Sequence, residues 1–387
     1  MQYASVLEIF LDGIGYMHLE LDQVIMILIS FCLAYLGIVK KYEPLLLIPI
    51  SFGMMIANIP LANLSAHDQG GLLNFLYMGI HLVIYPPLIF LCIGALTDFG
   101  PLISRPSNAL IGIGGQFGIF TALIIAFALG RVIPIPGFYD YFTIQESASI
   151  AIIGSSDGPT AIFLTSILAP ELLPTIAIAA YSYMALVPLI QPPIMRLLTT
   201  HEERIIVMPE AKAVTQRQRI LFPIVMTLVL VLLVPAAGGL IAMLMLGNLI
   251  RECGVCERYS RTLQNELLNV LTLLLGLSIG ATATAEAILN LRTVLIITLG
   301  LLAFAFGTVG GVLAAKILCY TSGGKVNPLI GNSGVSAMPM AARVSQKVGQ
   351  EYNPHSHLLM HAMGPIVAST IGSAVVAGLF IAFFGQF

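Results

Sequence analysis

Six long apolar runs constrain what this chain can fold into more than any other feature of its sequence. The runs are continuous, and none shows the strict alternation that is typical of a membrane barrel strand. They are Val24–Val39, Gly79–Leu96, Leu110–Gly130, Ile220–Val234, Leu267–Gly280 and Val294–Leu318. Only 9% of the 387 residues are charged, against roughly 25% in a soluble domain. We therefore expect an all-α polytopic membrane protein with room for roughly ten spans.

The charge pattern excludes one class of partner. The formal net charge is −2, and the sequence has no basic stripe of the kind that a nucleic-acid-binding surface needs. We therefore expect no nucleic-acid partner. The few basic residues are scattered on both sides of the spans, so the sequence leaves the orientation in the membrane open.

The segment Thr199–Arg219 is the longest polar stretch of the chain. It predicts an aqueous linker at 199–219 between two transmembrane repeats, 24–198 and 220–387, with an N-terminal segment at 1–23. Three landmarks recur in the same order in both halves: Asn58 and Asn248, Gly94 and Gly280, Asp157 and Ser336. Chance matching of Gly- and Ala-rich helices is the alternative. Transporter repeats are often inverted, and each half then contributes a broken helix to a site near the bilayer midplane.

The first predicted break is Gly154–Thr160, with the sequence GSSDGPT. Its glycines permit unusual backbone angles, and its proline lacks an N–H and disfavours helix before it. A buried Asp157 would cost about 2.5–3.5 kcal/mol in a membrane, which a bound Na⁺ or H⁺ would offset. The alternative is that Asp157 simply caps a helix.

The second predicted break runs from Asn327 to Pro339 and offers amide and hydroxyl oxygens without a carboxylate. Arg343 follows this break, and a guanidinium there could hold a carboxylate in a bidentate manner at any pH. The alternative is an arginine that extends from a helix end toward water.

Two further patterns are weaker. Tyr183 on an apolar helix is a candidate ligand or proton donor, although tyrosines are also common at membrane interfaces. His357 and His361 have a helical two-ligand spacing for a metal, but no third ligand is evident, so a hydrogen-bonded helix histidine is the favoured interpretation.

Four motifs together resemble a known family: GSSDGPTAIFLTSILAP, YSYMALVPLIQPPIM, NPLIGNSGVSAMPMAARVSQKVG and LLMHAMGP. The chain is similar to the membrane β subunit of the sodium-pumping biotin-dependent decarboxylases of oxaloacetate, methylmalonyl-CoA and glutaconyl-CoA. The similarity runs from about Leu91 to the C-terminus and less distinctly back to Pro44.

The resemblance implies a membrane subunit that decarboxylates carboxybiotin, consumes a proton and exports Na⁺. It implies as partners a biotin carrier subunit, a carboxyltransferase α subunit and a small membrane subunit, γ or δ, with self-association in the inner membrane of a prokaryote. The residues that match the family motifs are Asp157, Tyr183, Asn327, Gly331, Ser336 and Arg343. We expect Arg343, Tyr183 and Asp157 to be catalytic, and Arg343 and Asn327 to bind carboxybiotin. We expect Asp157, Ser336, Asn327, Gly331 and Asn332 to bind Na⁺.

Two positions depart from the family pattern. Ile366 follows HAMGP where the family usually has asparagine, and Asn332 and Ser333 stand where small alanines are expected. Either Asn332 compensates for the missing amide or one cation site is altered, so the Na⁺ stoichiometry stays open. The rival functions are a secondary Na⁺:carboxylate symporter and a non-catalytic membrane anchor.

Overall fold

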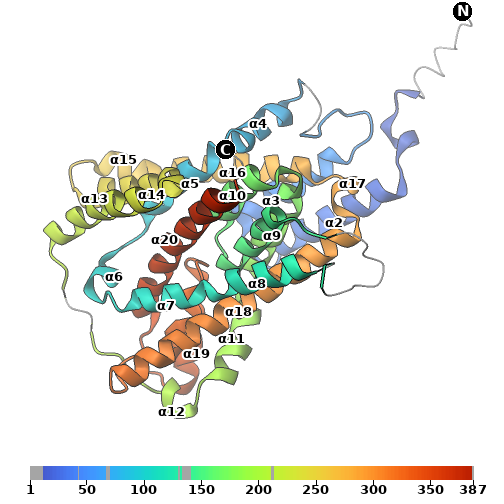
Figure 1. Cartoon of the computed structure of the whole chain (residues 1–387). Coiled ribbons are helices and arrows are strands. Elements are labelled where there is room, and N and C mark those ends of the chain that lie inside the picture. Colours follow the sequence, from blue (N-terminus) through green and yellow to red (C-terminus); the bar gives the residue numbers. More distant parts are fainter. Residues whose placement is uncertain are drawn as a thin grey trace, which may run out of the picture.

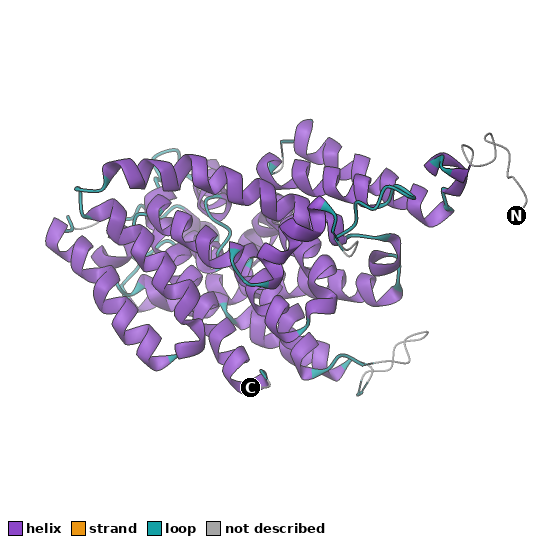
Figure 2. Cartoon of the chain, turned by 90° about the horizontal axis from the view of Figure 1, so that it is seen from above, coloured by secondary structure: helices purple, strands orange, loops and turns teal. Residues whose placement is uncertain are grey.

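The computed structural model describes residues 12–385 except 42, 67–69, 130, 133–140 and 211–212. Within these residues every regular element is a helix and no strand is present. The helices form a bundle in which most loops are short (Figure 1, Figure 2). The predicted all-α class is therefore confirmed.

Six helical stretches of the described chain are long and apolar enough to cross a membrane. They are Leu21–Ile38, Asn108–Ala128, Gln216–Leu233, Glu257–Thr282, Leu291–Thr321 and Leu359–Phe384. Two more spans are counted if each bent helix pair crosses once. α4 (Leu72–His81) and α5 (Tyr85–Leu96) meet at 70°, and the two parts of α11 (Leu173–Leu198) meet at 62°. The protein is thus a multi-pass membrane protein. The roughly ten expected spans require the shorter apolar helices Pro44–Ala57 and Gly158–Leu168 as well.

The first half of the chain begins with a short turn of 3₁₀ helix and continues as α-helices. Besides α4, α5 and α11, its α-helices are α2 (Leu21–Ile38), α3 (Pro44–Ala57), α6 (Gly100–Ser104), α7 (Asn108–Gly115), α8 (Phe117–Ala128), α9 (Ile144–Ala151) and α10 (Gly158–Leu168). The 3₁₀ turns are η1 (Gly15–His18), η2 (Ile152–Ser155) and η3 (Pro170–Leu172).

The rest of the chain begins with α12 (His201–Arg204), a single turn within the predicted linker. It continues with α13 (Gln216–Leu233), η4 (Pro235–Ala237), α14 (Gly238–Glu252), α15 (Glu257–Thr262), the π-helical η5 (Leu263–Leu267), α16 (Leu268–Thr282), α17 (Ala285–Ile288), α18 (Leu291–Thr321), η6 (Pro328–Gly334), α19 (Met340–Tyr352) and α20 (Leu359–Phe384).

Burial separates the central helices from the peripheral ones. In the spanning window of α20, 67% of the residues are buried within the protein, whereas the corresponding share is 6% in α13 and 17% in α2. Because α13 and α2 are apolar but exposed, their side chains suit contact with lipid or with another membrane chain. α20 therefore forms the centre of the bundle.

Two helix pairs cross at glycines in equivalent ways. α3 packs against α16, and α5 packs against α14. A Cβ atom added at Gly280 would collide with the carbonyl oxygen of Ile50, and one added at Gly94 would collide with that of Leu244. The predicted landmark pair of Gly94 and Gly280 thus occupies matching places, which supports a repeat. The inversion of one half relative to the other stays a prediction.

The predicted pairing of Asn58 with Asn248 is shifted by one helical turn. The glycine that matches Gly247 of α14 is Gly53 of α3, since they face the carbonyl oxygens of Leu91 and Leu277 in their partner helices. The asparagines still paired α3 with α14 correctly, because each lies near the end of its helix and donates to the residue just after the partner helix. Asn58 donates to the carbonyl oxygen of Ala283, and Asn248 to that of Thr97.

The two predicted repeats share one packed core. α3 and α5 of the first half pack against α16 and α14 of the second half, and α7 and α8 pack against α20 and α18. The division into 24–198 and 220–387 therefore describes a proposed sequence repeat and not two separately packed units.

Candidate functional site

The first predicted break lies between η2 and α10. Ser156 adopts a left-handed backbone conformation with a φ of 54°, which stops η2. Asp157 then caps α10 by accepting a hydrogen bond from the backbone N–H of Thr160 at 3.4 Å. The expected interruption is therefore present. The capping alternative is also realised, because Asp157 lies in the interruption and its carboxylate caps the helix that follows.

The second predicted break, from Asn327 to Pro339, contains the 3₁₀ turn η6 and ends at the start of α19. Residues 335–339 are non-helical and lie beside the first break. The backbone N–H of Ser336 donates a hydrogen bond of 2.7 Å to the carbonyl oxygen of Ser155. The two breaks, 179 residues apart in the sequence from Asp157 to Ser336, therefore meet directly.

The central helix α20 joins both breaks through hydroxyl groups. Ser373 donates to Oδ2 of Asp157 at 2.9 Å, and Ser336 donates to Ser369 at 3.0 Å. Ser369 also accepts a hydrogen bond of 3.2 Å from Gln116, which lies between α7 and α8. Ser369 and Ser373 are one helical turn apart on one face of α20, so this face connects Asp157 with Ser336.

A cavity of about 410 Å³ opens at the meeting point of the breaks. Its polar lining is contributed by Ser156, Asp157, Ser336 and Thr370. The remaining lining is Ile93, Leu96, Gly158, Pro159, Met184, Leu268, Met338, Pro339 and Met363. Oxygen groups thus gather at one place in a mostly apolar chamber, as is common in binding sites.

Asp157 is buried at 6% exposure and accepts only from hydroxyl and backbone groups among the described residues. The neighbouring Ser156 hydroxyl is buried without a hydrogen-bond partner in the described part of the chain. Carboxylate and hydroxyl oxygens are the ligands that hard cations prefer. The arrangement can therefore hold a monovalent cation or a proton on Asp157.

Three predicted cation ligands lie in or just before η6 and away from this cavity. Asn327 donates to the carbonyl oxygens of Arg204 and Ile206 at 3.1 and 2.9 Å and accepts from the backbone of Leu329. Gly331 packs against the backbone of α18.

Asn332 forms a buried hydrogen-bond network of its own. Its amide group donates to Gln191 at 2.8 Å and to the carbonyl oxygen of Ala341 at 2.9 Å, and its side-chain oxygen accepts from Ser345. Gln191 in turn donates to the backbone of Asn332 at 2.9 Å. The structure thus brings Asp157 and Ser336 together and holds Asn327, Gly331 and Asn332 in other contacts. Ile366 is fully buried in an apolar cluster and does not line the cavity.

The two remaining predicted residues lie in different surroundings. The Tyr183 hydroxyl is buried and donates to the carbonyl oxygen of Ile297, although its neighbour Met184 lines the cavity. Arg343 is exposed in the first turn of α19, close after the cavity residue Pro339. Burial raises the pKa of Glu43, and the nearby Arg343 guanidinium lowers it in turn. Arg343 therefore lies close enough to Glu43 to act on its charge, and it does not line the cavity of Asp157.

Comparison with known proteins decides the family. The family model of the Na⁺-transporting oxaloacetate decarboxylase beta subunit matches residues 22–384. The chain belongs to this family. It is 51% identical to the methylmalonyl-CoA decarboxylase subunit beta of Propionigenium modestum, with 97% of this chain and 98% of that protein covered. It is 50% identical to the glutaconyl-CoA decarboxylase subunit beta of Acidaminococcus fermentans, with 96% of each chain covered. It is 46% identical to the oxaloacetate decarboxylase beta chain of Klebsiella pneumoniae, with 97% and 98% covered.

The sequence did not predict that hydroxyl groups of α20 belong to the site of this decarboxylase beta-subunit chain. Ser369, Thr370 and Ser373 lie within an apolar span. The only sequence signal was this cluster of hydroxyls in an otherwise apolar helix. Because serine and threonine also bond to their own helix, as Thr370 does to the carbonyl of Ile366, the cluster did not by itself indicate a site.

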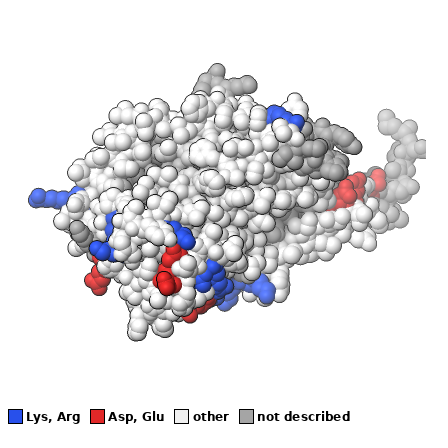
Figure 3. Space-filling view, turned by 60° about the horizontal axis from the view of Figure 1, so that its bottom comes forward, with Lys and Arg blue, Asp and Glu red and all other residues white. Residues whose placement is uncertain are grey.

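The fold also gathers the scattered basic residues of the decarboxylase beta-subunit chain at one end. Arg105 donates to the carbonyls of Pro209 and Glu210, Arg204 to Tyr352, and Lys316 to the carbonyl of Leu198. We call this the basic end and define it by Arg105, Arg196, Arg204, Arg219, Arg251 and Lys316. Figure 3 shows charged side chains gathered in the lower part of a mostly uncharged surface.

The opposite end of the molecule carries fewer basic groups. Arg292 begins α18 and pairs with Glu146, whereas Lys316 lies 24 residues further along the same helix, a rise of about 36 Å. Leu96 links the basic end to the site, because its carbonyl accepts from Arg251 at 2.7 Å and its side chain lines the cavity of Asp157.

Proposed function

We propose that this chain decarboxylates carboxybiotin delivered by a biotin carrier, couples this reaction to Na⁺ export, and consumes one proton per turnover. The observation that carries the proposal is the buried Asp157 at the junction of two helix breaks, in a cavity with Ser156 and Ser336. The relatives are named as beta subunits of decarboxylases, which supports the reaction class.

Na⁺ is the transported substrate in this proposal. Asp157 supplies the negative charge, and Ser336 supplies a neutral oxygen from the other break. An ion placed there would satisfy the Ser156 hydroxyl, which has no partner among the described residues. We further propose Asn327, Gly331 and Asn332 as ligands along the second break in a later step, in which their oxygens leave their present partners.

We propose that the basic end faces the cytoplasm of a prokaryotic cell, with the chain in the inner membrane. Basic loops are enriched on the cytoplasmic side of membrane proteins, and in the described part of the chain this end gathers basic side chains from several distant segments. The carrier, the carboxyltransferase α subunit and a small γ or δ subunit would meet the chain here or beside it. The exposed apolar helices α2 and α13 would serve self-association.

Arg343 is the proposed receptor for the carboxylate of carboxybiotin. A guanidinium can hold that carboxylate through two hydrogen bonds, and Asn327 would assist binding from the second break. Since equally tight binding of ground state and transition state does not accelerate a reaction, transfer of the group into the apolar cavity must favour loss of CO₂.

The reaction breaks the bond between the ureido nitrogen and the carboxylate carbon, and CO₂ leaves. The electron pair of that bond stays on the nitrogen, which takes up a proton. We propose Tyr183 as the relay for this proton, once its hydroxyl leaves the carbonyl of Ile297. Proton entry to Asp157 would release Na⁺, and moving each cation outward costs about 2.3 kcal/mol per 100 mV.

Reconstitution of the complete complex into proteoliposomes tests the proposed function. Addition of the decarboxylation substrate should drive ²²Na⁺ uptake, and avidin should abolish the uptake because it sequesters biotin. A secondary symporter would accumulate Na⁺ with a carboxylate gradient regardless of avidin, and a simple anchor would accumulate none. Avidin-insensitive uptake, or decarboxylation without uptake in sealed vesicles, would contradict the proposal.

A further inference from the structure

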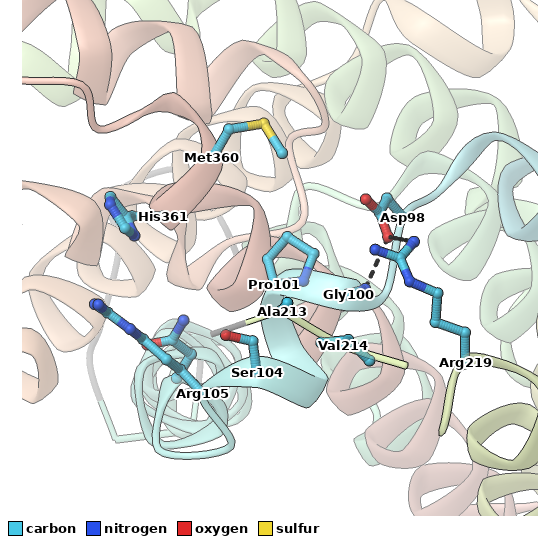
Figure 4. Close-up of a pocket in the computed structure, with 11 residues that line it drawn as sticks. Asp98, Gly100, Pro101, Ser104, Arg105, Ala213, Val214, Arg219, Met360 and His361 are labelled. Atoms are coloured by element: carbon cyan, nitrogen blue, oxygen red, sulfur yellow. Dashed lines mark hydrogen bonds and ion pairs between the residues drawn. The ribbon is translucent and has the colours of Figure 1, made fainter. Parts of the chain in front are cut away.

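A second cavity, of about 170 Å³, lies among the polar side chains of the basic end (Figure 4). Its lining includes Ser104 and Arg105, which lie before α7, and Asn108, the first residue of α7. Arg219 of α13 and His361 of α20 complete its polar side chains together with Asp98. We call it the basic-end pocket. It shares no lining residue with the cavity of Asp157.

Several hydrogen-bond donors in the basic-end pocket have no acceptor. Asn108 is 2% exposed, and its amide group has no hydrogen-bond partner within the described part of the chain. The Ser104 hydroxyl is buried and also without a partner there. Arg105 uses Nη2 for two backbone carbonyls, which leaves Nη1 and Nε. Because an unsatisfied buried polar group costs about 1–3 kcal/mol, a ligand with acceptor oxygens would be stabilised here.

The charges around the basic-end pocket determine which anion fits. Arg219 lies 3.1 Å from Asp98 and 3.6 Å from Glu252, and Arg251 lies 3.6 Å from the same Glu252. The two positive charges of these arginines are therefore balanced by the two negative charges of Asp98 and Glu252. Arg105 extends toward His361 on the opposite side of the pocket from the Arg219–Asp98 pair (Figure 4). No ion pair joins Arg105 to an acid among the residues that the structure describes, so one positive charge remains.

A single uncompensated guanidinium matches a monoanion better than a doubly charged phosphate. The planar fork of arginine also matches the two oxygens of a carboxylate. We propose that the basic-end pocket binds a monocarboxylate, held by Arg105 with Ser104 and Asn108 as further donors. Arg219 closes the pocket and stays paired with Asp98.

The basic-end pocket adjoins the cavity of Asp157. Met360 lines the pocket, and Met363, one helical turn further along α20, lines the cavity. Likewise, Asp98 lines the pocket, and Leu96, two residues before it, lines the cavity. The carboxylate has two candidate sources with the same chemistry: the N-carboxylate of carboxybiotin on its way to the cavity, which rests on the proposed function, and a free small carboxylate such as bicarbonate.

Protection of Arg105 from phenylglyoxal tests the inference. The full chain in detergent is modified in Na⁺-free buffer with acetate, bicarbonate or free carboxybiotin, at constant ionic strength adjusted with chloride. Peptide mass spectrometry reports the modification of each arginine. A saturating carboxylate should slow modification of Arg105 by about tenfold, as expected for hydrogen bonds to a charged group. Arg261, whose side chain is 75% exposed, should react at the same rate throughout.

Matched variants locate the effect. Asn108→Asp keeps the side-chain shape but adds a repelling charge, and Ser104→Ala removes one donor with little risk to folding. Each should weaken the protecting affinity by about tenfold, whereas Ser107→Ala, at an exposed position in the same turn, should leave it unchanged.

Each outcome has a meaning. Protection by all three carboxylates assigns a free carboxylate as occupant, and protection by carboxybiotin alone assigns the carrier's group. No protection, or equal protection by chloride, overturns the inference. Since Arg343 is read in the same digest, protection of Arg343 without protection of Arg105 would refute the pocket and leave the proposed function standing.

Discussion

The two helix breaks touch each other, yet they treat their polar side chains differently. Among the residues that the structure describes, Asp157 at the first break accepts hydrogen bonds from only a hydroxyl and a backbone N–H, and the hydroxyl of Ser156 has no partner. At the second break, Asn332 exchanges hydrogen bonds with Gln191 in both directions and accepts one from Ser345. The first break thus keeps capacity for a ligand, and the second break satisfies its own polar groups. Proximity alone therefore does not make every buried polar residue a ligand.

The largest expected effect is that of Asp157→Asn. The variant keeps the shape of the side chain and removes the charge, so folding should persist and activation of decarboxylation by Na⁺ should be lost. Loss of a buried charge partner costs about 3–5 kcal/mol, which corresponds to a rise of more than 100-fold in the Na⁺ concentration for half activation. The exposed carboxylate Glu171 provides the matched control, Glu171→Gln. Ordinary Na⁺ activation in Asp157→Asn would refute the difference between the breaks.

Asn332→Ala should affect stability instead. It leaves the side-chain oxygen of Gln191 without its donor and removes the side-chain acceptor of the Ser345 hydroxyl, both in a fully buried place. Each such group costs about 1–3 kcal/mol, so we expect a loss of about 3 kcal/mol in the free energy of unfolding. Denaturant titration in detergent measures it. If this variant were as stable as the wild type, the second break would not be held by its network.

Ser373→Ala removes the hydroxyl that donates to Oδ2 of Asp157. A hydrogen bond to a charged group contributes about 1.5–3 kcal/mol, so the Na⁺ concentration for half activation should change by about tenfold, with folding preserved. Thr227→Val on the exposed helix α13 is the control, because its hydroxyl donates to the carbonyl oxygen of Pro223 in its own helix. An unchanged Na⁺ titration would exclude α20 from the site.

Ser336→Ala should have the smallest effect. Its hydroxyl is one neutral donor to Ser369, and its backbone bond to Ser155 survives the substitution. A neutral hydrogen bond contributes about 0.5–1.5 kcal/mol, so Na⁺ activation should weaken by only a few-fold. A loss of Na⁺ activation as large as that in Asp157→Asn would mean that the second break, and not the first, contributes most to Na⁺ binding.

The breaks were predictable from sequence because their causes are local. Gly154 and Pro159 favour an interruption of the helix at their place in the apolar run, and Asp157 is costly in a membrane unless it has a function. The resemblance of the motifs to a decarboxylase family added the reaction class. The contact between Ser336 and Ser155 followed from the assumption of a repeat, which local signals could not establish.

Other features could not be predicted because they depend on the tertiary arrangement. The hydroxyl of Ser373 could equally have bonded only to its own helix, and only the packing of α20 aims it at Asp157. The basic end assembles from Arg105, Arg204 and Lys316, which no sequence window contains together. The partner of the Tyr183 hydroxyl, the carbonyl of Ile297, lies 114 residues away and leaves no pattern.

Direct Na⁺ binding tests the central claim, that the first break holds the transported ion. Equilibrium dialysis with ²²Na⁺ would compare the purified wild type with Asp157→Asn and Glu171→Gln in the absence of carrier and substrate. We predict saturable binding in the wild type and in Glu171→Gln, and its loss in Asp157→Asn while the folded state remains. Equal saturable binding in all three proteins would contradict the account.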